Sequence, residues 1–133
     1  MSHEPLTVRI PMTPDRVLSP NHDRANKYHR SRCKREIKTA AASATVDVLR
    51  GETWKHSGPI VLHISYYFER NRKRSMDRDN AIAMAKAAVD GVFLHLDADD
   101  RQITDHKLEQ LRDPDGIGYM VIVVEPVAEQ EAA

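Results

Sequence analysis

The segment from Pro59 to Glu69 restricts the fold more than any other part of this chain. It reads PIVLHISYYFE, so large apolar side chains recur at every second position. That period is typical of a β-strand, because successive side chains of a strand point to opposite faces of the sheet. The face that we expect to pack on a core carries Ile60, Leu62, Ile64, Tyr66 and Phe68. Such a strand needs neighbouring strands and a layer that covers its apolar face.

Three other segments carry strand signals. Residues 5–18 begin with the alternating Leu6, Val8 and Ile10, followed by a turn with prolines and a second short extended piece. Residues 117–125, IGYMVIVVE, are predicted to form a buried strand, preceded by a turn at 113–116. Residues 101–112 fit either a strand with polar alternation or a short helix.

Two segments show the period of a helix instead. The first runs from about His29 to Leu49, is rich in alanine, and is followed by Gly51 as a C-cap. Its apolar face is predicted to contain Ile37, Ala41, Ala44 and Val48. The second runs from about Arg78 to Leu96 and is apolar on nearly all sides, which predicts a buried helix.

The order strand, helix, strand, helix, strand indicates an α+β fold. With 133 residues, 41% of them hydrophobic, the chain is long enough for one core but not for two. We therefore predict a compact single domain over residues 1–133, with a mixed β-sheet and two main helices packed on one face. Residues 126–133 are acidic and are expected to form a flexible tail.

Composition narrows the possible functions. Aromatic residues make up only 5%, which argues against a stacking platform for single-stranded nucleic acid. Cys33 is the one cysteine, so it cannot form an intrachain disulfide, and no spacing typical of a zinc site surrounds it. We expect no functional role for it. The sequence shows no signal peptide and no apolar run long enough to cross a membrane, which favours a cytoplasmic protein.

The formal net charge of zero conceals two segments of opposite charge. Residues 22–86 contain 15 Lys and Arg against 7 Asp and Glu, whereas residues 97–133 contain 3 against 10. The basic segment is suited to bind a polyanion, and the acidic one to bind a metal or to solvate a tail. Two ordinary solvated faces would show the same pattern, so charge by itself leaves both interpretations open.

The motif Asp77-Arg78-Asp79-Asn80 is the first candidate for chemistry. Its two aspartates are two residues apart, so they face the same way if they lie at the end of an extended segment. Neighbouring carboxylates repel each other, and a divalent cation between them removes that repulsion. Mg²⁺ needs only two or three carboxylates because it keeps several waters. The competing interpretation is that either aspartate merely caps the following helix.

A line of charge along the second predicted helix is the next candidate. At roughly 100° per residue, Lys86 and Asp90 each lie within about 20° of Asp79. A lysine in this stripe would neutralise a phosphate or a developing oxyanion, although Lys86 and Asp90 could also form only an ion pair. Asp99 and Asp100, beyond the helix, would supply a further metal ligand or form a solvated turn.

Basic residues gather in two clusters. The first, at the start of the first helix, contains Arg24, Lys27, His29, Arg30, Arg32, Lys34, Arg35 and Lys38. Positive charge there opposes the helix dipole, and contact with phosphate would offset this. The second cluster, next to Asp77, contains Arg70, Arg72, Lys73, Arg74 and Arg78. A metal-dependent nuclease needs basic groups beside acidic ones, because the aspartates that attract the metal also repel DNA.

The sequence resembles the RusA family of Holliday-junction resolvases. One stretch that carries the resemblance is Leu18-Ser19-Pro20-Asn21, Tyr28-His29-Arg30, Arg32-Cys33-Lys34-Arg35 and the alanine-rich helix. The other is Asp77-Arg78-Asp79-Asn80, Lys86, Asp90 and Asp99-Asp100-Arg101-Gln102-Ile103. The strand at 117–125 also fits, so the resemblance spans nearly the whole chain.

The resemblance implies a homodimeric, Mg²⁺-dependent endonuclease, with Mn²⁺ as a substitute, that nicks opposing strands of a four-way junction in DNA recombination and repair. It implies catalytic roles for Asp77, Asp79, Asp100 and Lys86, although Lys86 stands about one helical turn beyond the family's lysine. The metal ligands would be Asp77, Asp79 and Asp100, with Asp99 and Asp97 competing for the third position. The residues expected to contact DNA are Asn21, Arg24, Lys27, Arg30, Arg32, Lys34, Arg35, Arg72, Lys73 and Arg74.

Two other functions are consistent with the same residues. The chain could bind branched DNA without cutting it, in which case the acidic cluster serves only the fold. It could also be a metal-dependent phosphohydrolase that acts on nucleotides. In none of these cases do we expect a membrane partner or a nucleotide cofactor.

Overall fold

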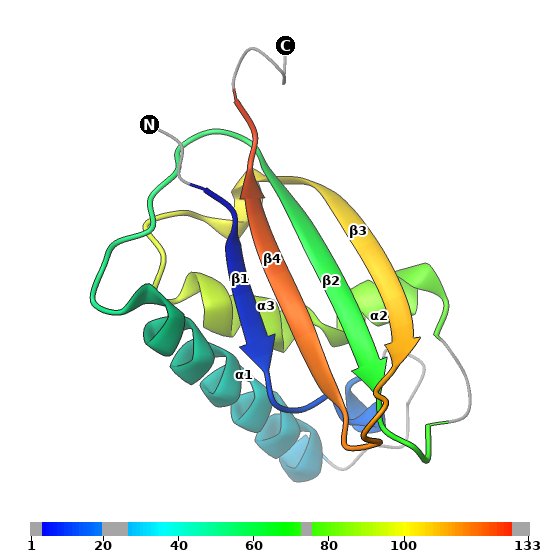
Figure 1. Ribbon diagram of the computed structural model, residues 1–133. Coiled ribbons are helices and arrows are strands. Elements are labelled where there is room, and N and C mark those ends of the chain that lie inside the picture. The colour runs from blue at the N-terminus through cyan, green and yellow to red at the C-terminus, as the bar shows by residue number, and fades with distance from the viewer. Residues whose placement is uncertain (1–3, 20–26, 73–75, 129–133) are drawn as a thin grey trace.

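The computed structural model describes residues 4–19, 27–72 and 76–128, and these form an α+β domain. Within them, four strands form one sheet and three helices lie behind it (Figure 1). The strands are β1 (Leu6–Ile10), β2 (Ile60–Phe68), β3 (Ile103–Arg112) and β4 (Tyr119–Pro126). The helices are α1 (Lys27–Leu49), α2 (Arg78–Met84) and α3 (Lys86–Phe93), with the 3₁₀ turns η1 (Arg16–Leu18) and η2 (Asp100–Gln102).

The sheet has the strand order β1-β4-β2-β3 and is mixed, as predicted. β4 pairs antiparallel with both β1 and β2, whereas β2 and β3 are parallel. A parallel pair requires a crossover connection, and α2 and α3 together provide it. The start of α2 therefore follows the carboxyl end of β2, and η2 directly precedes the amino end of β3.

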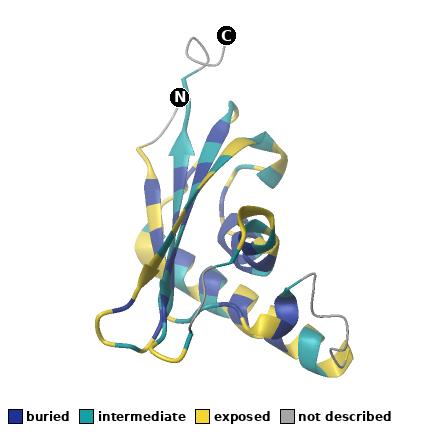
Figure 2. Ribbon diagram, turned by 90° about the vertical axis from the view of Figure 1, so that its right-hand side faces the viewer, coloured by how far each residue is buried: buried dark blue, intermediate teal, exposed yellow. Residues whose placement is uncertain are grey.

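The core lies between the sheet and the helices (Figure 2). All five apolar residues predicted to face inward from β2 are buried, as are the three from β1. β3 is an edge strand whose residues are partly buried or exposed, which selects the strand interpretation of residues 101–112. None of the helices in the described parts of the chain is both long and apolar enough to span a membrane.

Helix α1 buries a stripe that differs slightly from the predicted one. The buried residues are Cys33, Ile37, Ala41 and Thr45. The prediction was wrong for Val48, which is 43% exposed, because the buried stripe repeats every four residues and leaves Val48 on the solvent side. Thr45 is tolerated in the interior because its hydroxyl donates to the carbonyl of Ala41 at 2.8 Å.

The second predicted helix is interrupted. Ala85, with φ −80° and ψ −9°, separates α2 from α3, so the expected single helix over 78–96 was wrong. It is not buried on all sides either, since Leu94 is 61% exposed. Helix α3 approaches α1 closely at Gly91, where an added Cβ would lie 2.3 Å from the Lys38 carbonyl oxygen. Glycine at this position lets α3 lie directly against α1.

The segments that join the elements depart from expectation at two places. The second extended piece predicted near residue 16 is the 3₁₀ turn η1, which is capped by the Asp15 side chain through the Val17 N–H. The predicted strand at 117–125 begins only at Tyr119, because the Asp113 carboxylate accepts hydrogen bonds from the backbone of the preceding turn. Pro126, predicted to begin the acidic tail, still belongs to β4, and residues 129–133 lie outside the described residues.

Candidate metal-dependent active site

The start of α2 presents two exposed carboxylates on a fixed backbone. Asp77 occupies the N-cap position, with φ −65° and ψ 158°, yet its side chain forms no capping hydrogen bond. Asp79 follows in the first turn and is also exposed. The preceding Met76 is held by Gln110 of β3, which accepts from its N–H at 2.7 Å and donates to its carbonyl at 2.6 Å. The capping interpretation of Asp77 is therefore not supported by a side-chain bond.

Two further contacts fix α2 against the rest of the fold. The hydroxyl of Tyr66 donates to the carbonyl of Ala81 at 2.6 Å, and burial raises the pKa of this tyrosine well above its ordinary value. Ser19 donates from its hydroxyl to the side-chain oxygen of Asn80 at 3.0 Å. This bond joins residues 61 positions apart, each from one of the two motifs that carry the family resemblance.

Lys86 connects α3 to η2. Its ammonium group donates to Asp90 at 2.8 Å and to Asp100 at 3.4 Å. The hydrogen bond with Asp90 is the main cause of a raised Lys86 pKa; partial burial opposes it and Asp100 adds to it. The side chain is 66% exposed, so its charge is accessible to a ligand. The Lys86–Asp90 part of the predicted stripe is thus a real contact, and Asp100 joins it from beyond the helix.

Asp99 is committed to the structure of η2. Its carboxylate accepts from the Arg101 N–H at 2.9 Å, and its own N–H donates to the Gln102 side chain at 2.6 Å, which together form a capping box. The backbone N–H of Arg101, followed by its guanidinium and by Asp100, lowers the pKa of Asp99 to about 2. Gln102 in turn donates to the carbonyls of His56 and Gly58, both at 2.8 Å.

Asp97 is engaged with another part of the chain. It forms an isolated β-bridge with Lys55 and an ion pair with the ammonium group of that lysine at 3.8 Å. Of the three aspartates that compete for the third metal position, Asp100 is therefore the one that contacts Lys86. Asp97 and Asp99 have structural partners instead.

The predicted metal ligands do not converge into one tight cluster. Among the described residues, the groups of three or more possible ligands with ligand atoms within 4.8 Å of one another do not include Asp77, Asp79 and Asp100. The topology explains this difference, because the first two follow β2 whereas Asp100 precedes β3, at opposite ends of a parallel pair. Like-charged carboxylates also repel, and Asp100 pairs with Lys86.

Two basic residues of α1, Arg30 and Lys34, share a cavity with Lys86. Lys27, Arg32, Lys34 and Arg35 are exposed, and Arg30 is half-buried because its guanidinium donates to the Val17 carbonyl at 2.8 Å. A cavity of about 280 Å³ lies where η1, α1, α2 and α3 meet. It is lined by Leu18, Arg30, Lys34, Ala83, Met84, Lys86, Ala87 and Asp90.

The remaining residues expected to contact DNA are placed differently. Arg72 binds Glu69 at 2.8 Å and the Pro14 carbonyl at 3.1 Å, and its side chain is only 10% exposed. Its guanidinium therefore stabilises the loop and is not available to bind DNA at the surface. Four other residues lie outside the described parts of the chain, namely Asn21, Arg24, Lys73 and Arg74.

Sequence reasoning missed two features. Gln110 holds the approach to Asp77, but its only sequence signal was a place in a polar strand. Cys33, for which no role was expected, lies with Asp15 and His29 in a group whose ligand atoms are within 4.8 Å of one another. The four-residue spacing of His29 and Cys33 is visible in the sequence, whereas the approach of Asp15 is not.

The chain matches no protein-family model and no curated protein sequence. The resemblance to the RusA family stays a prediction from the two motifs and their spacing.

Proposed function

We propose that this chain is a Mg²⁺-dependent endonuclease that resolves four-way DNA junctions by paired nicking. The observation that carries the proposal is the hydrogen bond between Ser19 and Asn80, because it joins the two motifs on which the family resemblance rests. Lys86, Arg30 and Lys34 line a cavity where η1, α1, α2 and α3 meet. A four-way junction requires two symmetric cuts, so we propose that two copies of the chain act together.

The residues that would hold the metal are Asp77, Asp79 and Asp100. Their hard carboxylate oxygens fit Mg²⁺, and the side chain of Asp77 makes no capping bond that a metal would have to displace. Because Asp100 lies at the other end of the parallel pair from Asp77 and Asp79, it would hold a second ion rather than share theirs. When bound, the ion would lower the pKa of a coordinated water and offset negative charge on the phosphate.

The chain's own cations would handle the DNA. Lys86 is held in place by Asp90 and Asp100, and its exposed ammonium group would contact the scissile phosphate. Lys34 borders the same cavity and, with Arg32, would bind the neighbouring phosphate backbone. Arg30 would mainly hold α1 in position, since its guanidinium donates a hydrogen bond to the Val17 carbonyl.

The test is incubation of the purified chain with a synthetic four-way junction and with a linear duplex of the same sequence. Each is assayed with Mg²⁺ and with EDTA. We expect symmetric nicks in the junction only, and only with Mg²⁺. Junctions that are bound but never cut would show a non-cleaving DNA-binding protein. Hydrolysis of free nucleotides without junction cleavage would show a phosphohydrolase instead.

A further inference from the structure

Three possible metal ligands of different chemistry meet beside η1. One carboxylate oxygen of Asp15, one ring nitrogen of His29 and the sulfur of Cys33 all lie within 4.8 Å of one another. His29 and Cys33 are four residues apart on α1, which places them on the same face of the helix. The Cys33 sulfur is 3.9 Å from Nδ1 and 3.8 Å from Nε2 of the imidazole.

The third ligand is fixed independently of the other two. Asp15 is the N-cap of η1, and its Oδ1 accepts from the Val17 N–H at 2.9 Å. This bond holds the carboxylate within 4.8 Å of the ligand atoms of His29 and Cys33 on α1. Burial, followed by the charges of Asp15 and Glu36, raises the pKa of the Cys33 thiol.

The set of donors selects the class of ion. Imidazole, thiolate and carboxylate together are typical ligands of Zn²⁺, whereas Mg²⁺ and Ca²⁺ take oxygen ligands. In a tetrahedral zinc site with bonds of about 2.0–2.3 Å, neighbouring ligand atoms are roughly 3.3–3.8 Å apart. The Cys33–His29 separations of 3.8 and 3.9 Å come close to that range without any change of the backbone.

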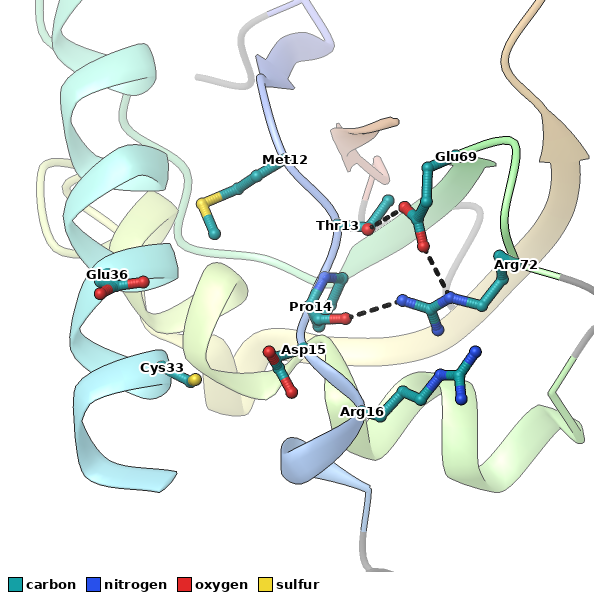
Figure 3. Close-up of a pocket in the computed structure, with 9 residues that line it drawn as sticks. All are labelled: Met12, Thr13, Pro14, Asp15, Arg16, Cys33, Glu36, Glu69 and Arg72. Carbon is teal, nitrogen blue, oxygen red and sulfur yellow. Dashed lines mark hydrogen bonds and ion pairs between the residues drawn. The ribbon is translucent and has the colours of Figure 1, made fainter. Parts of the chain in front are cut away.

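A fourth position is available on the side of a cavity. Asp15 and Cys33 line a space of about 360 Å³ and point toward one another at its edge (Figure 3). Glu36, one helical turn beyond Cys33, lines the same space and would supply a fourth ligand directly or through water. Arg32 lies beside the site, with its guanidinium 3.0 Å from Nδ1 of His29. Arg32 is exposed, so it can turn to solvent when an ion takes the ring nitrogen.

We propose that Asp15, His29 and Cys33 bind a thiophilic divalent ion of the zinc class. The site is distinct from the proposed Mg²⁺ site and does not depend on the proposed nuclease function. Its position suggests a structural role, since Ser19, four residues beyond Asp15, is bonded to α2. An ion here would tie the segment that carries Ser19 to α1.

The test is a titration of the untagged, metal-free chain with Co²⁺, followed by absorption spectroscopy without DNA. We expect one ion per chain, intense visible bands of a tetrahedral site and a sulfur-to-cobalt charge-transfer band in the near ultraviolet. Because the chain has one cysteine, that band reports on Cys33 alone. Zn²⁺ should abolish the spectrum, and excess Mg²⁺ should leave it unchanged. Absence of the charge-transfer band would overturn the proposal.

Variants separate this site from weaker binding by a single side chain. Cys33→Ser should remove the charge-transfer band, and His29→Ala or Asp15→Asn should weaken Co²⁺ binding at least about tenfold. Asparagine keeps the cap of η1, so Asp15→Asn tests ligation rather than folding. His95→Ala, at an exposed histidine elsewhere, is the matched control and should bind normally. If His29→Ala and Asp15→Asn bound Co²⁺ as tightly as the wild type does, the three-ligand site would be contradicted. A stoichiometry of half an ion per chain would contradict it as well.

Discussion

Asp77 and Asp99 occupy the same position in two different helical turns, and their side chains behave in opposite ways. Each is the N-cap residue, with extended backbone dihedral angles, of α2 and η2 respectively. Asp99 uses its carboxylate in a capping box and in an ion pair with Arg101. Asp77 forms no capping bond. A capping position therefore does not by itself make an aspartate structural, and the hydrogen bonds must decide.

The same contrast separates the residues that follow. The carboxylate of Asp100 accepts a hydrogen bond from Lys86, whereas that of its neighbour Asp99 accepts one within η2, from the Arg101 N–H. Each turn is also held by a glutamine: Gln110 binds the backbone before Asp77, and Gln102 binds the backbone around Asp99. Both turns therefore have a fixed backbone. At the start of α2 the aspartates are exposed, whereas at η2 the carboxylate of Asp99 is used in hydrogen bonds.

The largest expected effect comes from replacing the acids themselves. Asp77→Asn, Asp79→Asn and Asp100→Asn should each reduce junction cleavage in Mg²⁺ by at least about 100-fold, because loss of a ligand's outer partner alone costs roughly 10–100-fold. Junction binding should be retained or strengthened. Asp99→Ala should change cleavage only a few-fold but lower the midpoint of urea unfolding, because it removes the side chain that caps η2. An Asp99→Ala variant that is inactive but as stable as the wild type would show that Asp99 acts in the site rather than as a cap.

A smaller effect is expected from the residue that holds the approach to Asp77. Gln110→Ala removes both bonds to Met76, so it should cost roughly 1–3 kcal/mol of unfolding free energy and reduce cleavage about 10-fold or more. Gln110→Glu still accepts from the N–H but cannot donate, so it should fall between the wild type and alanine. Glu109→Ala, at an exposed neighbour on β3, is the control. Unchanged cleavage by Gln110→Ala would show that the hydrogen bonds between Gln110 and Met76 do not support the proposed site.

The smallest effect is a change in acid stability at a third aspartate. Asp113 accepts from the backbone N–H groups of Gly118, Asp115 and Ile117, at 2.9, 2.9 and 3.2 Å, and these bonds lower its pKa. Because the folded-state pKa is depressed, this stabilisation is present above the ordinary carboxyl value of about 3.9 and is lost as the pH falls through the folded value.

Urea unfolding of the wild type and of Asp113→Asn across the acid range measures this contribution. The wild type should be more stable near neutral pH, and the difference should shrink below about pH 4. Asp115→Asn, in the same turn but without these three bonds to its carboxylate, is the matched control. A difference that does not change with pH would show that Asp113 acts by shape rather than by charge.

The sequence predicted the elements whose signal is local. The alternation in residues 60–68 and the alanine-rich period of α1 led to the correct strand and helix, because burial on one face repeats along the chain itself. The break at Ala85 could not be predicted, since no proline or glycine marks it. Val48 was misassigned because two apolar stripes one residue apart look alike until packing selects one.

For the candidate site, the sequence predicted which residues take part but not how they contact one another. Charge, spacing and family resemblance pointed to Asp77, Asp79, Lys86 and the pair Asp99-Asp100, which are all features of the chain read in order. The contact of Lys86 with Asp100 and the bond from Ser19 to Asn80 join segments that are separated in the sequence, so they depend on the packed fold. The same holds for Asp15 beside Cys33. Such contacts follow from topology, because hydrogen bonds between distant segments exist only after the sheet and helices have packed.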